Sequence, residues 1–344
     1  MINRAILNVA FPFARISEST AGGAEQVLHF LDKKISRSGN RSIVLASKGS
    51  KVNGLLYEFE EDIDLINEAK REEIYKKYQS EIEDILSDQN IDLIHFHGLD
   101  FRQYLPPTSI PVLVTLHLPV PWYRPDCFSI EGINFNFVSR FQFLKYGKKI
   151  NVPFFIENGV NIPEKMPERK RGAYTLSMGR ICPEKGYHLA IEASKRVNLP
   201  YILAGKVYPY EDHIKYFRNY IKPAIHNQTC EFIGEIDSKQ KEKLFRRAVC
   251  LLVPSLVEET SSLVAMEAMA FGVPVIAFKA GALIDIIKEG KNGYLVNNEI
   301  EMAQAISDAE KIYPIECYNM AINNYSVDRM TRQYLELYEK LINC

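Results

Sequence analysis

Short apolar runs alternate with segments of helical periodicity along the whole chain. In the N-terminal half, runs typical of buried strands occur at Ala5–Ala10, Ser42–Ala46, Asp92–Phe96, Val112–Leu116 and Phe135–Val138. Helical patterns lie between them, including Glu25–Ser36 and a charged segment at Asp64–Gln89. This order predicts a parallel sheet of the doubly wound type.

A second series of the same kind follows in the C-terminal half. Its predicted strands are Tyr174–Met178, Tyr201–Ala204, Glu231–Ile233, Val249–Val253 and Val275–Ala277, with a helix starting at Gly186. The polar run Pro163–Gly172 interrupts the alternation and is the predicted linker. We therefore predict one α/β domain over residues 1–162, a linker over 163–172 and a second α/β domain over 173–325.

The last segment, Ser326–Asn343, has the apolar stripe of an amphipathic helix. The stripe consists of Met330, Tyr334, Leu335, Tyr338 and Leu341. We treat residues 326–344 as a separate C-terminal helix.

Composition narrows the class of protein only slightly. A chain of 344 residues suits two domains, and its net charge of −1 gives no indication of nucleic-acid binding. Its six cysteines are scattered with no CxxC pair, which is typical of a reduced, cytoplasmic protein. The mildly apolar N-terminus is too short and interrupted for a signal peptide, and no run approaches 18 apolar residues.

Two glutamates flank the start of a predicted helix in the C-terminal half. Glu259 follows the predicted strand Val249–Val253, and Glu267 lies on the helix; seven residues separate them. Glu258 is a neighbouring alternative, but only Glu259 gives this gap. The small residues Thr260–Ser262 between them offer backbone amides to an anion. Carboxylates that accept sugar hydroxyls, together with amides that bind phosphate, suit a phosphorylated, polyhydroxylated ligand.

This stretch resembles the E-x7-E signature of glycosyltransferase family 4, the retaining, nucleotide-sugar-dependent enzymes of GT-B fold. Further motifs occur in the family's order: Gly22–Glu25 (GGAE), His95–His97 (HFH), Thr115–His117 (TLH), Glu157–Val160 (ENGV) and Gly179–Gly186 (GRICPEKG). The resemblance spans nearly the whole chain. It implies two Rossmann-like domains facing a cleft, with the C-terminal helix crossing back onto the N-terminal domain.

The implied activity is transfer of a sugar from a nucleoside-diphosphate sugar to a hydroxyl acceptor, such as a glycan, a glycolipid or a small molecule. By resemblance, Glu267 binds the ribose hydroxyls and Glu259 holds hydroxyls of the donor sugar. The backbone of Ser262, Leu263 and Val264 then faces the phosphates. The chain departs from the family where Thr260–Ser262 replaces a triplet that contains glycine, which leaves less room for the ligand.

Cations are needed where the nucleoside diphosphate leaves, because negative charge grows on its oxygens. Arg180 and Lys185 lie in the loop after a predicted strand, and both suit this role. The guanidinium of Arg180 can donate to two oxygens at once, and the ammonium of Lys185 is a compact positive charge. One ion pair at about 4 Å contributes on the order of 4 kcal/mol at an effective dielectric of 20. We expect both side chains to stabilise the leaving group.

The N-terminal half supplies further candidates. Gly22 and Gly23 permit close backbone approach to the sugar or diphosphate. His97 resembles the family's histidine beside the donor sugar; the alternative is a hydrogen-bonded core histidine. His117 suits the acceptor side or support of the fold, and Trp122 suits either stacking on an acceptor ring or anchoring of its loop. No carboxylate or cysteine spacing near these histidines indicates a metal site, so we expect neither metal nor cofactor.

No carboxylate is an evident covalent nucleophile, so we expect a metal-independent, front-face displacement. The alternatives are another GT-B enzyme, either a sugar-nucleotide epimerase or a phosphorylase, and a non-catalytic donor-binding subunit. The stretch Phe137–Ile150 mixes aromatics with Arg and Lys. It suits peripheral contact with the inner face of an anionic membrane, or a helix whose apolar face lies in the core.

Overall fold

The computed structural model describes residues 3–17, 20, 22–60, 68–170 and 172–343. Two compact units make up the chain. The first comprises Met1–Asn158 together with Val327–Cys344, and the second comprises Gly159–Ser326. Each unit is described by itself below.

The first unit is built on one sheet in which every described strand pair is parallel. The strand order is β3-β2-β1-β4-β5-β6-β7. The strands are β1 (Ala5–Val9), β2 (Arg41–Ser47), β3 (Leu55–Phe59), β4 (Leu93–Phe96), β5 (Val112–Leu116), β6 (Ile133–Phe137) and β7 (Phe154–Phe155). The chain reverses its direction across the sheet between β1 and β4, so the carboxyl ends of these two strands form the switch point where ligands bind in such sheets.

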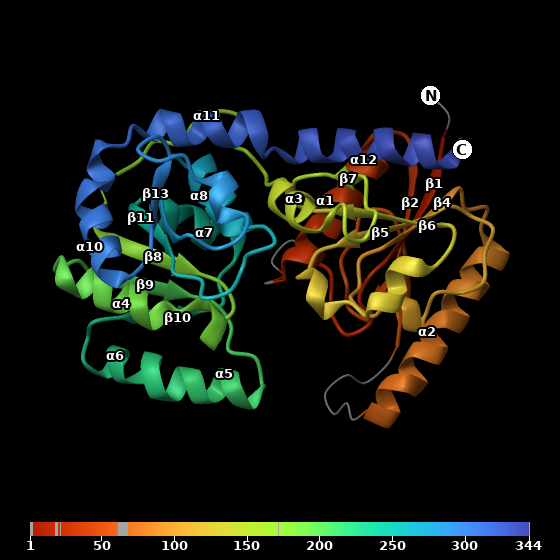
Figure 1. Ribbon diagram of the computed structural model, residues 1–344, viewed down its shortest axis with the longest axis horizontal. Coiled ribbons are helices and arrows are strands. Elements are labelled where there is room, and N and C mark those ends of the chain that lie inside the picture. Colours follow the sequence, from red (N-terminus) through yellow and green to blue (C-terminus); the bar gives the residue numbers. More distant parts are fainter. Residues whose placement is uncertain (1–2, 18–19, 21, 61–67, 171, 344) are drawn as a thin grey trace. The chain divides into compact units, whose positions relative to one another are not determined.

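Helices cover this sheet (Figure 1). They are α1 (Gly23–Arg37), α2 (Glu68–Asp88), α3 (Arg140–Tyr146), α12 (Val327–Ile342) and the short 3-10 turns η1 (Phe101–Gln103), η2 (Val120–Trp122) and η3 (Pro125–Ser129). Apolar side chains of α2 close one core, in which Tyr78 is fully buried. Its hydroxyl donates to the carbonyl oxygens of Ala10 and Leu45, each at 3.0 Å, at the ends of β1 and β2. The predicted start of α2 at Asp64 lies outside the described residues.

The second unit repeats the architecture with the order β10-β9-β8-β11-β12-β13, again with parallel pairs. Its strands are β8 (Tyr174–Met178), β9 (Tyr201–Ala204), β10 (Glu231–Gly234), β11 (Ala248–Val253), β12 (Val275–Phe278) and β13 (Gly293–Val296). Its helices are η4 (Pro183–Lys185), α4 (Tyr187–Arg196), α5 (Glu211–Tyr216), η5 (Phe217–Ile221), α6 (Lys222–His226), α7 (Ser238–Phe245), α8 (Leu263–Ala270), α9 (Leu283–Ile286), α10 (Glu299–Asp308), η6 (Ala309–Lys311) and α11 (Pro314–Asn324). Here the switch point lies between β8 and β11.

The C-terminal helix α12 belongs to the first unit and packs against α1 and β4. Of its predicted stripe, Met330, Tyr334 and Tyr338 are buried. The Tyr338 hydroxyl lies 2.7 Å from Nδ1 of His95. The Tyr334 hydroxyl accepts from the amide of Asn136 at 3.2 Å. The helix is therefore bound to the sheet by buried hydrogen bonds as well as by apolar contact.

Two parts of the fold differ from the expectations. The predicted linker, residues 163–172, lies within the second unit, because the guanidinium of Arg169 donates to the carbonyl oxygens of Gly272 and Ala248. Residue 171 of this stretch is outside the described residues. Strands β3, β7 and β13 are additional to the predicted ones. They are short and only partly buried, so each gives a weak signal in the sequence.

Candidate functional site

The loops after β8 and β11 carry three of the charged residues that we predict at the donor site. Both loops leave the carboxyl ends of the two strands at the switch point of the second sheet. The loop after β8 contains Arg180 and Lys185, and the loop after β11 contains Glu259. The fold thus brings residues 74 positions apart to one edge of one sheet.

Backbone geometry holds the two loops tightly together. Gly186 has a φ of +62°, and a Cβ at this position would lie 2.3 Å from the carbonyl oxygen of Pro254. The amide of Leu256 donates to the carbonyl oxygen of Glu184 at 2.8 Å. A larger residue at position 186 would therefore push apart the loops that carry the charged side chains.

Lys185 and Glu259 form an ion pair at the centre of this edge. The Lys185 Nζ lies 2.6 Å from the Glu259 Oε1, and their side chains are 24% and 11% exposed. The hydroxyl of Ser255 donates to the same carboxylate oxygen. Glu258 is exposed, so the structure favours Glu259 as the buried member of the sequence pair. Two residues predicted separately thus form one polar cluster.

The segment that follows β12 holds the backbone of Glu259 in place. Its carbonyl oxygen accepts from the amide of Ala282 at 2.8 Å, and it forms a parallel bridge with Gly281. Gly281 has a φ of +60°, and a Cβ there would lie 2.3 Å from that carbonyl oxygen. Only glycine fits this position without displacing the glutamate.

Helix α8 begins directly after this loop, as predicted. Ser262 is its N-cap, and its carbonyl oxygen accepts from the amides of Ala265 and Met266, each at 3.1 Å. The first amides of an α-helix have no intrahelical acceptor, so those of Leu263 and Val264 are available to an anion. The buried hydroxyl of Ser261 has no hydrogen-bond partner among the described residues.

Glu267, on α8, is paired with a lysine that sequence reasoning missed. The Lys241 Nζ, on α7, lies 2.7 Å from the Glu267 Oε1, and the side chains are 26% and 16% exposed. No spacing pattern links residues on two separate helices, so only the packing of α7 beside α8 identifies Lys241.

Arg180 is exposed at the end of β8, and it lies near a second polar group in the same loop. The Cys182 thiol donates toward Glu184, and burial raises the pKa of this thiol to about 11. Burial alone would raise the pKa of the Glu184 carboxyl, but hydrogen bonds from its own amide and from the thiol, with the charges of His213 and Arg180, lower it.

The three predicted histidines of the first unit form a buried cluster at the ends of β4 and β5. The rings of His95 and His97 have centroids 4.0 Å apart, and the Nδ1 of His97 lies 3.0 Å from the Nε2 of His117. The Nε2 of His97 lies 3.4 Å from the Oδ1 of Asn8. Burial lowers the pKa of all three rings, for His117 to about 3, so they are neutral at pH 7. His97 therefore has the contacts of the alternative, a hydrogen-bonded core histidine.

Two other candidates of the first unit lie closer to its surface. Gly22 is the N-cap of α1, where a Cβ would lie 1.8 Å from a carboxylate oxygen of Glu25, and Gly23 begins the helix and is exposed. Trp122 exposes 54% of its surface at the end of η2. Both interpretations of Trp122, stacking on an acceptor ring and anchoring of its loop, therefore stay predictions.

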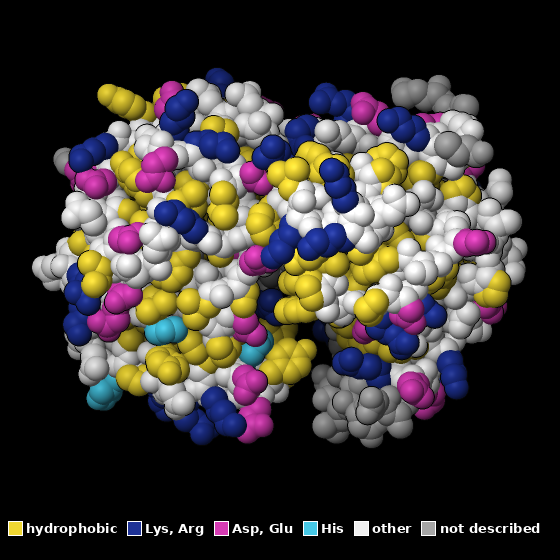
Figure 2. Space-filling view, viewed as in Figure 1, with side chains coloured by type: hydrophobic (Ala, Val, Ile, Leu, Met, Phe, Trp, Pro, Cys, Tyr) yellow, Lys and Arg dark blue, Asp and Glu magenta, His cyan; other side chains and the backbone are white. Residues whose placement is uncertain are grey.

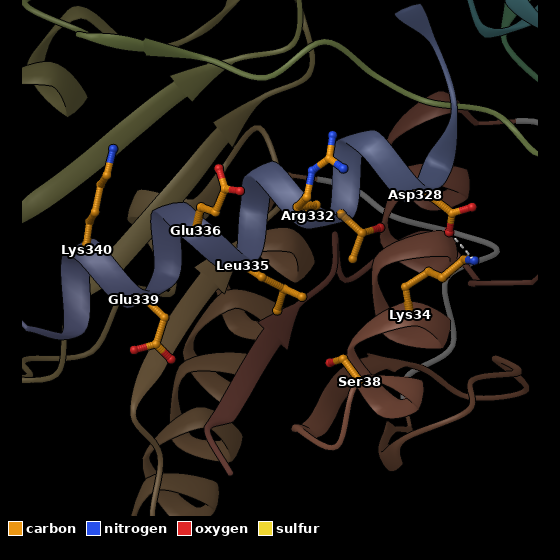
Figure 3. Close-up of a pocket in the computed structure, with 9 residues that line it drawn as sticks. Lys34, Ser38, Asp328, Arg332, Leu335, Glu336, Glu339 and Lys340 are labelled. Atoms are coloured by element: carbon orange, nitrogen blue, oxygen red, sulfur yellow. Dashed lines mark hydrogen bonds and ion pairs between the residues drawn. The ribbon is translucent and has the colours of Figure 1, made fainter. Parts of the chain in front are cut away.

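A groove of about 690 Å³ lies between α1 and α12, away from every predicted site residue (Figure 3). Leu335 of α12 faces Lys34 of α1 and Ser38, the C-cap of that helix, across it. Among the charged residues that line it, Lys34 binds Asp328, and Glu339 binds Arg4, which lies outside the lining. We interpret it as the seam between two packed helices.

The predicted residues thus fall into two sets. The second unit holds Arg180, Lys185, Glu259, Ser262, Leu263, Val264 and Glu267, and the first unit holds Gly22, Gly23, His97, His117 and Trp122. The helices among the described residues are all too short or too polar to cross a membrane.

Comparison with known proteins agrees with this geometry. Residues 160–326 match the family model "Glycosyl transferases group 1", so the second unit is a domain of that kind. The chain is 28% identical to lipopolysaccharide 1,2-N-acetylglucosaminetransferase of Salmonella typhimurium over 44% of its own length and 42% of that protein's. It therefore spans less than half the length of this curated relative.

Solved structures establish the fold of the whole chain. A sucrose-phosphate synthase from Thermosynechococcus elongatus superposes with a TM-score of 0.80 at 18% identity, over 99% of this chain and all of that chain. The Anabaena protein HepE, solved in complex with UDP-glucose, gives a TM-score of 0.72 at 18% identity, over 98% of this chain and 99% of that chain. Together with the two parallel sheets, these matches confirm the predicted GT-B fold.

Proposed function

We propose that this chain is a retaining glycosyltransferase that moves a sugar from a nucleoside-diphosphate sugar to a hydroxyl acceptor. The observation that carries the proposal is the edge of the second sheet. There Lys185, Glu259 and the start of α8 meet at the switch point of a domain of the glycosyltransferase group 1 type. Such an edge is where α/β sheets bind their ligands.

The donor contacts follow from the chemistry of the groups. The carboxylate of Glu267 accepts the ribose hydroxyls, with Lys241 holding it in place. Glu259 accepts hydroxyls of the donor sugar. The amides at the start of α8 and the unpartnered hydroxyl of Ser261 donate to phosphate oxygens. The carboxylates thus accept hydrogen bonds from the hydroxyls of the nucleotide sugar, and the amides and the hydroxyl donate hydrogen bonds to its phosphate oxygens.

Arg180 and Lys185 neutralise the leaving diphosphate. Without a donor, Lys185 is paired with Glu259, so its ammonium is already oriented toward the site. A pair at about 4 Å contributes on the order of 4 kcal/mol at an effective dielectric of 20, which corresponds to roughly a thousandfold in rate if it acts only in the transition state.

The reaction itself needs one bond broken and one formed. The bond between the anomeric carbon and the diphosphate oxygen breaks, and its electron pair leaves with the nucleoside diphosphate. The acceptor oxygen bonds to the same carbon on the same face, and its proton passes to a phosphate oxygen. We propose that this chemistry needs no metal ion, since Arg180 and Lys185 take the charge.

The acceptor side is assigned to the first unit. Trp122 offers an exposed ring for stacking on a sugar, and His117 lies deeper at the same sheet end. Gly22 and Gly23 present the amide end of α1 to the donor's sugar or diphosphate. His97 acts in this proposal through orientation of His117, since its ring is buried and bonded to it.

We propose, in addition, that α3 supports peripheral contact with an anionic membrane. Leu144 exposes 63% of its surface, and Phe155, whose ring packs against that of Phe143 in α3, is 37% exposed. Lys145 lies over the rings of Phe141 and Tyr146. Figure 2 shows Lys and Arg side chains beside hydrophobic ones in this region. Cosedimentation with phosphatidylglycerol vesicles, but not with phosphatidylcholine vesicles, tests this contact, and Leu144→Ser should weaken it.

The experiment that tests the function is a thermal-shift screen against nucleoside diphosphates and their sugars. Relatives of this fold were solved with UDP-glucose and with ADP, so uracil and adenine nucleotides come first. A ligand that binds the folded protein raises the midpoint temperature of unfolding. A rise that occurs with one nucleotide base and not with the others therefore identifies the nucleotide of the donor. Mass spectrometry then separates transfer to an acceptor from an isomerised donor or a released sugar phosphate. Stabilisation without any conversion would instead support a non-catalytic donor-binding subunit.

A further inference from the structure

Three side chains that commonly bind metal ions gather beside the loop after β8. The Sγ of Cys182, a carboxylate oxygen of Glu184 and a ring nitrogen of His213 all lie within 4.8 Å of one another. Cys182 and Glu184 come from the loop and from η4, whereas His213 lies on α5. Cys182 and His213 are 1% and 9% exposed, so two of the three groups are buried.

One of these groups lacks a partner. The buried Nδ1 of His213 has no hydrogen-bond partner among the residues that the structure describes. Burying a polar nitrogen without a hydrogen bond is unfavourable, so such an atom indicates a missing ligand. The ring of Tyr210 packs edge-on against His213 at 5.1 Å between centroids, which limits how far the imidazole can turn away.

We propose that Cys182, Glu184 and His213 form a binding site for a divalent transition-metal ion of the Zn²⁺ type, with a fourth position open to water. Thiolate, imidazole and carboxylate are the ligands that zinc accepts together, whereas Mg²⁺ and Ca²⁺ prefer oxygen. Ligand atoms around tetrahedral zinc lie roughly 3.3 to 3.6 Å apart. The three ligand atoms, which lie within 4.8 Å of one another, must therefore move closer together when the ion binds.

Charge fits the same ion. The thiolate and the carboxylate together offset the two positive charges of the metal, and the imidazole binds as a neutral ligand. Arg180 acts electrostatically on Glu184 and on His213. Its guanidinium opposes a cation at this site, so we expect binding that is reversible and removed by chelators.

The ion would strengthen the link between two elements that already contact each other. It ties η4 to α5, and η4 ends at Lys185, the partner of Glu259. Metal binding therefore restrains the loop that carries the proposed phosphate-binding lysine. This inference rests on the three ligands alone and does not depend on the proposed function, for which no metal is needed.

The test titrates Co²⁺ into the full-length, chelator-treated protein, with Zn²⁺ as competitor. A cobalt ion bound by Cys182 gives a thiolate-to-metal charge-transfer band in the near ultraviolet. We expect one such ion in the wild type, displaced by Zn²⁺. Cys182→Ser abolishes the band, and Glu184→Gln and His213→Gln each weaken binding by about 10-fold or more, since even outer-shell changes cost 10- to 100-fold.

The matched controls are Cys127→Ser, in the other unit, and His226→Gln, an exposed histidine on α6. Both should keep the band and the affinity of the wild type. Equal binding by Cys182→Ser and the wild type would mean adventitious metal and would overturn the proposal, as would a wild type without the band. Glu184→Gln is nearly isosteric, so a folded protein with weakened binding separates loss of a ligand from loss of structure, which circular dichroism monitors.

Discussion

Removing the lysine of the ion pair between Lys185 and Glu259 should have two separable effects. In Lys185→Ala, the Glu259 carboxylate, 11% exposed, keeps only the hydroxyl of Ser255 among the partners described above. An unpaired and largely buried charge destabilises the folded unit. The same substitution removes the ammonium that we assign to the leaving diphosphate. Stability and turnover should therefore both fall.

The size of the stability loss follows from burial. Removing one partner of a fully buried pair costs about 3–5 kcal/mol, and an exposed pair contributes about 0–1 kcal/mol. Because Lys185 is 24% exposed, we expect an intermediate loss of about 2 kcal/mol. Such a loss lowers the ratio of folded to unfolded protein about 30-fold. Replacing Glu259 by Gln as well should recover most of it, since no charge is then left unpaired.

The assay must report on the second unit. The chain's only tryptophan, Trp122, lies in the first unit, so tryptophan fluorescence does not report on the second unit. We would instead measure, by mass spectrometry, the hydrogen exchange of peptides from β8 and β11, which lie in the second unit. Lys311→Ala is the matched control, because it breaks an exposed ion pair with Asp308. If exchange and donor affinity of Lys185→Ala equal those of this control, the assigned role of the ion pair is refuted.

Three further predictions concern other positions. Gly281→Ala should destabilise the second unit by more than about 1 kcal/mol and weaken donor binding, since its Cβ would strike the backbone of Glu259. Gly290→Ala has a similar φ with nothing within 4 Å, so in calorimetry it should show strain without loss of donor affinity. His117 has a pKa of about 3 when folded and about 6.5 when unfolded, so its contribution to stability is complete above pH 6.5 and is lost as pH falls toward 3. Between these pH values the free energy of unfolding should fall by up to about 1.4 kcal/mol per pH unit because of this group, so the thermal midpoint should fall with it, and His117→Gln should flatten that slope. Trp122→Ala should raise the KM for the acceptor while leaving donor affinity unchanged, and the reverse pattern would contradict an acceptor role.

The alternation of apolar runs and helices predicted two doubly wound α/β domains, and the resemblance to glycosyltransferase family 4 implied the GT-B fold. Strands buried on both faces have continuous apolar sequences, so β1, β4, β8 and β11 were evident. Edge strands such as β3 and β13 were missed because they are short and only partly buried.

The candidate site could be predicted only where its residues are close in sequence. The loops after β8 and β11 each contain a recognisable motif, so their charged residues were found. Lys241 and His213 lie on other helices and reach their partners only through tertiary packing. Likewise, the contact of Tyr338 with His95 joins residues 243 positions apart, and no local pattern indicates it.

The place of α12 in the sequence has a consequence for biosynthesis. The first unit is interrupted, since its last helix follows the entire second unit. At about 5–20 residues per second, the ribosome delivers α12 roughly 10 to 30 seconds after Asn158. Until then, β4 lacks the helix that covers it and the imidazole of His95 lacks Tyr338. The second unit is continuous and can complete its folding first, so the units are completed in the reverse of the order in which their synthesis begins. A nascent chain paused before α12 presents to chaperones a sheet in which β4 lacks the helix that packs against it.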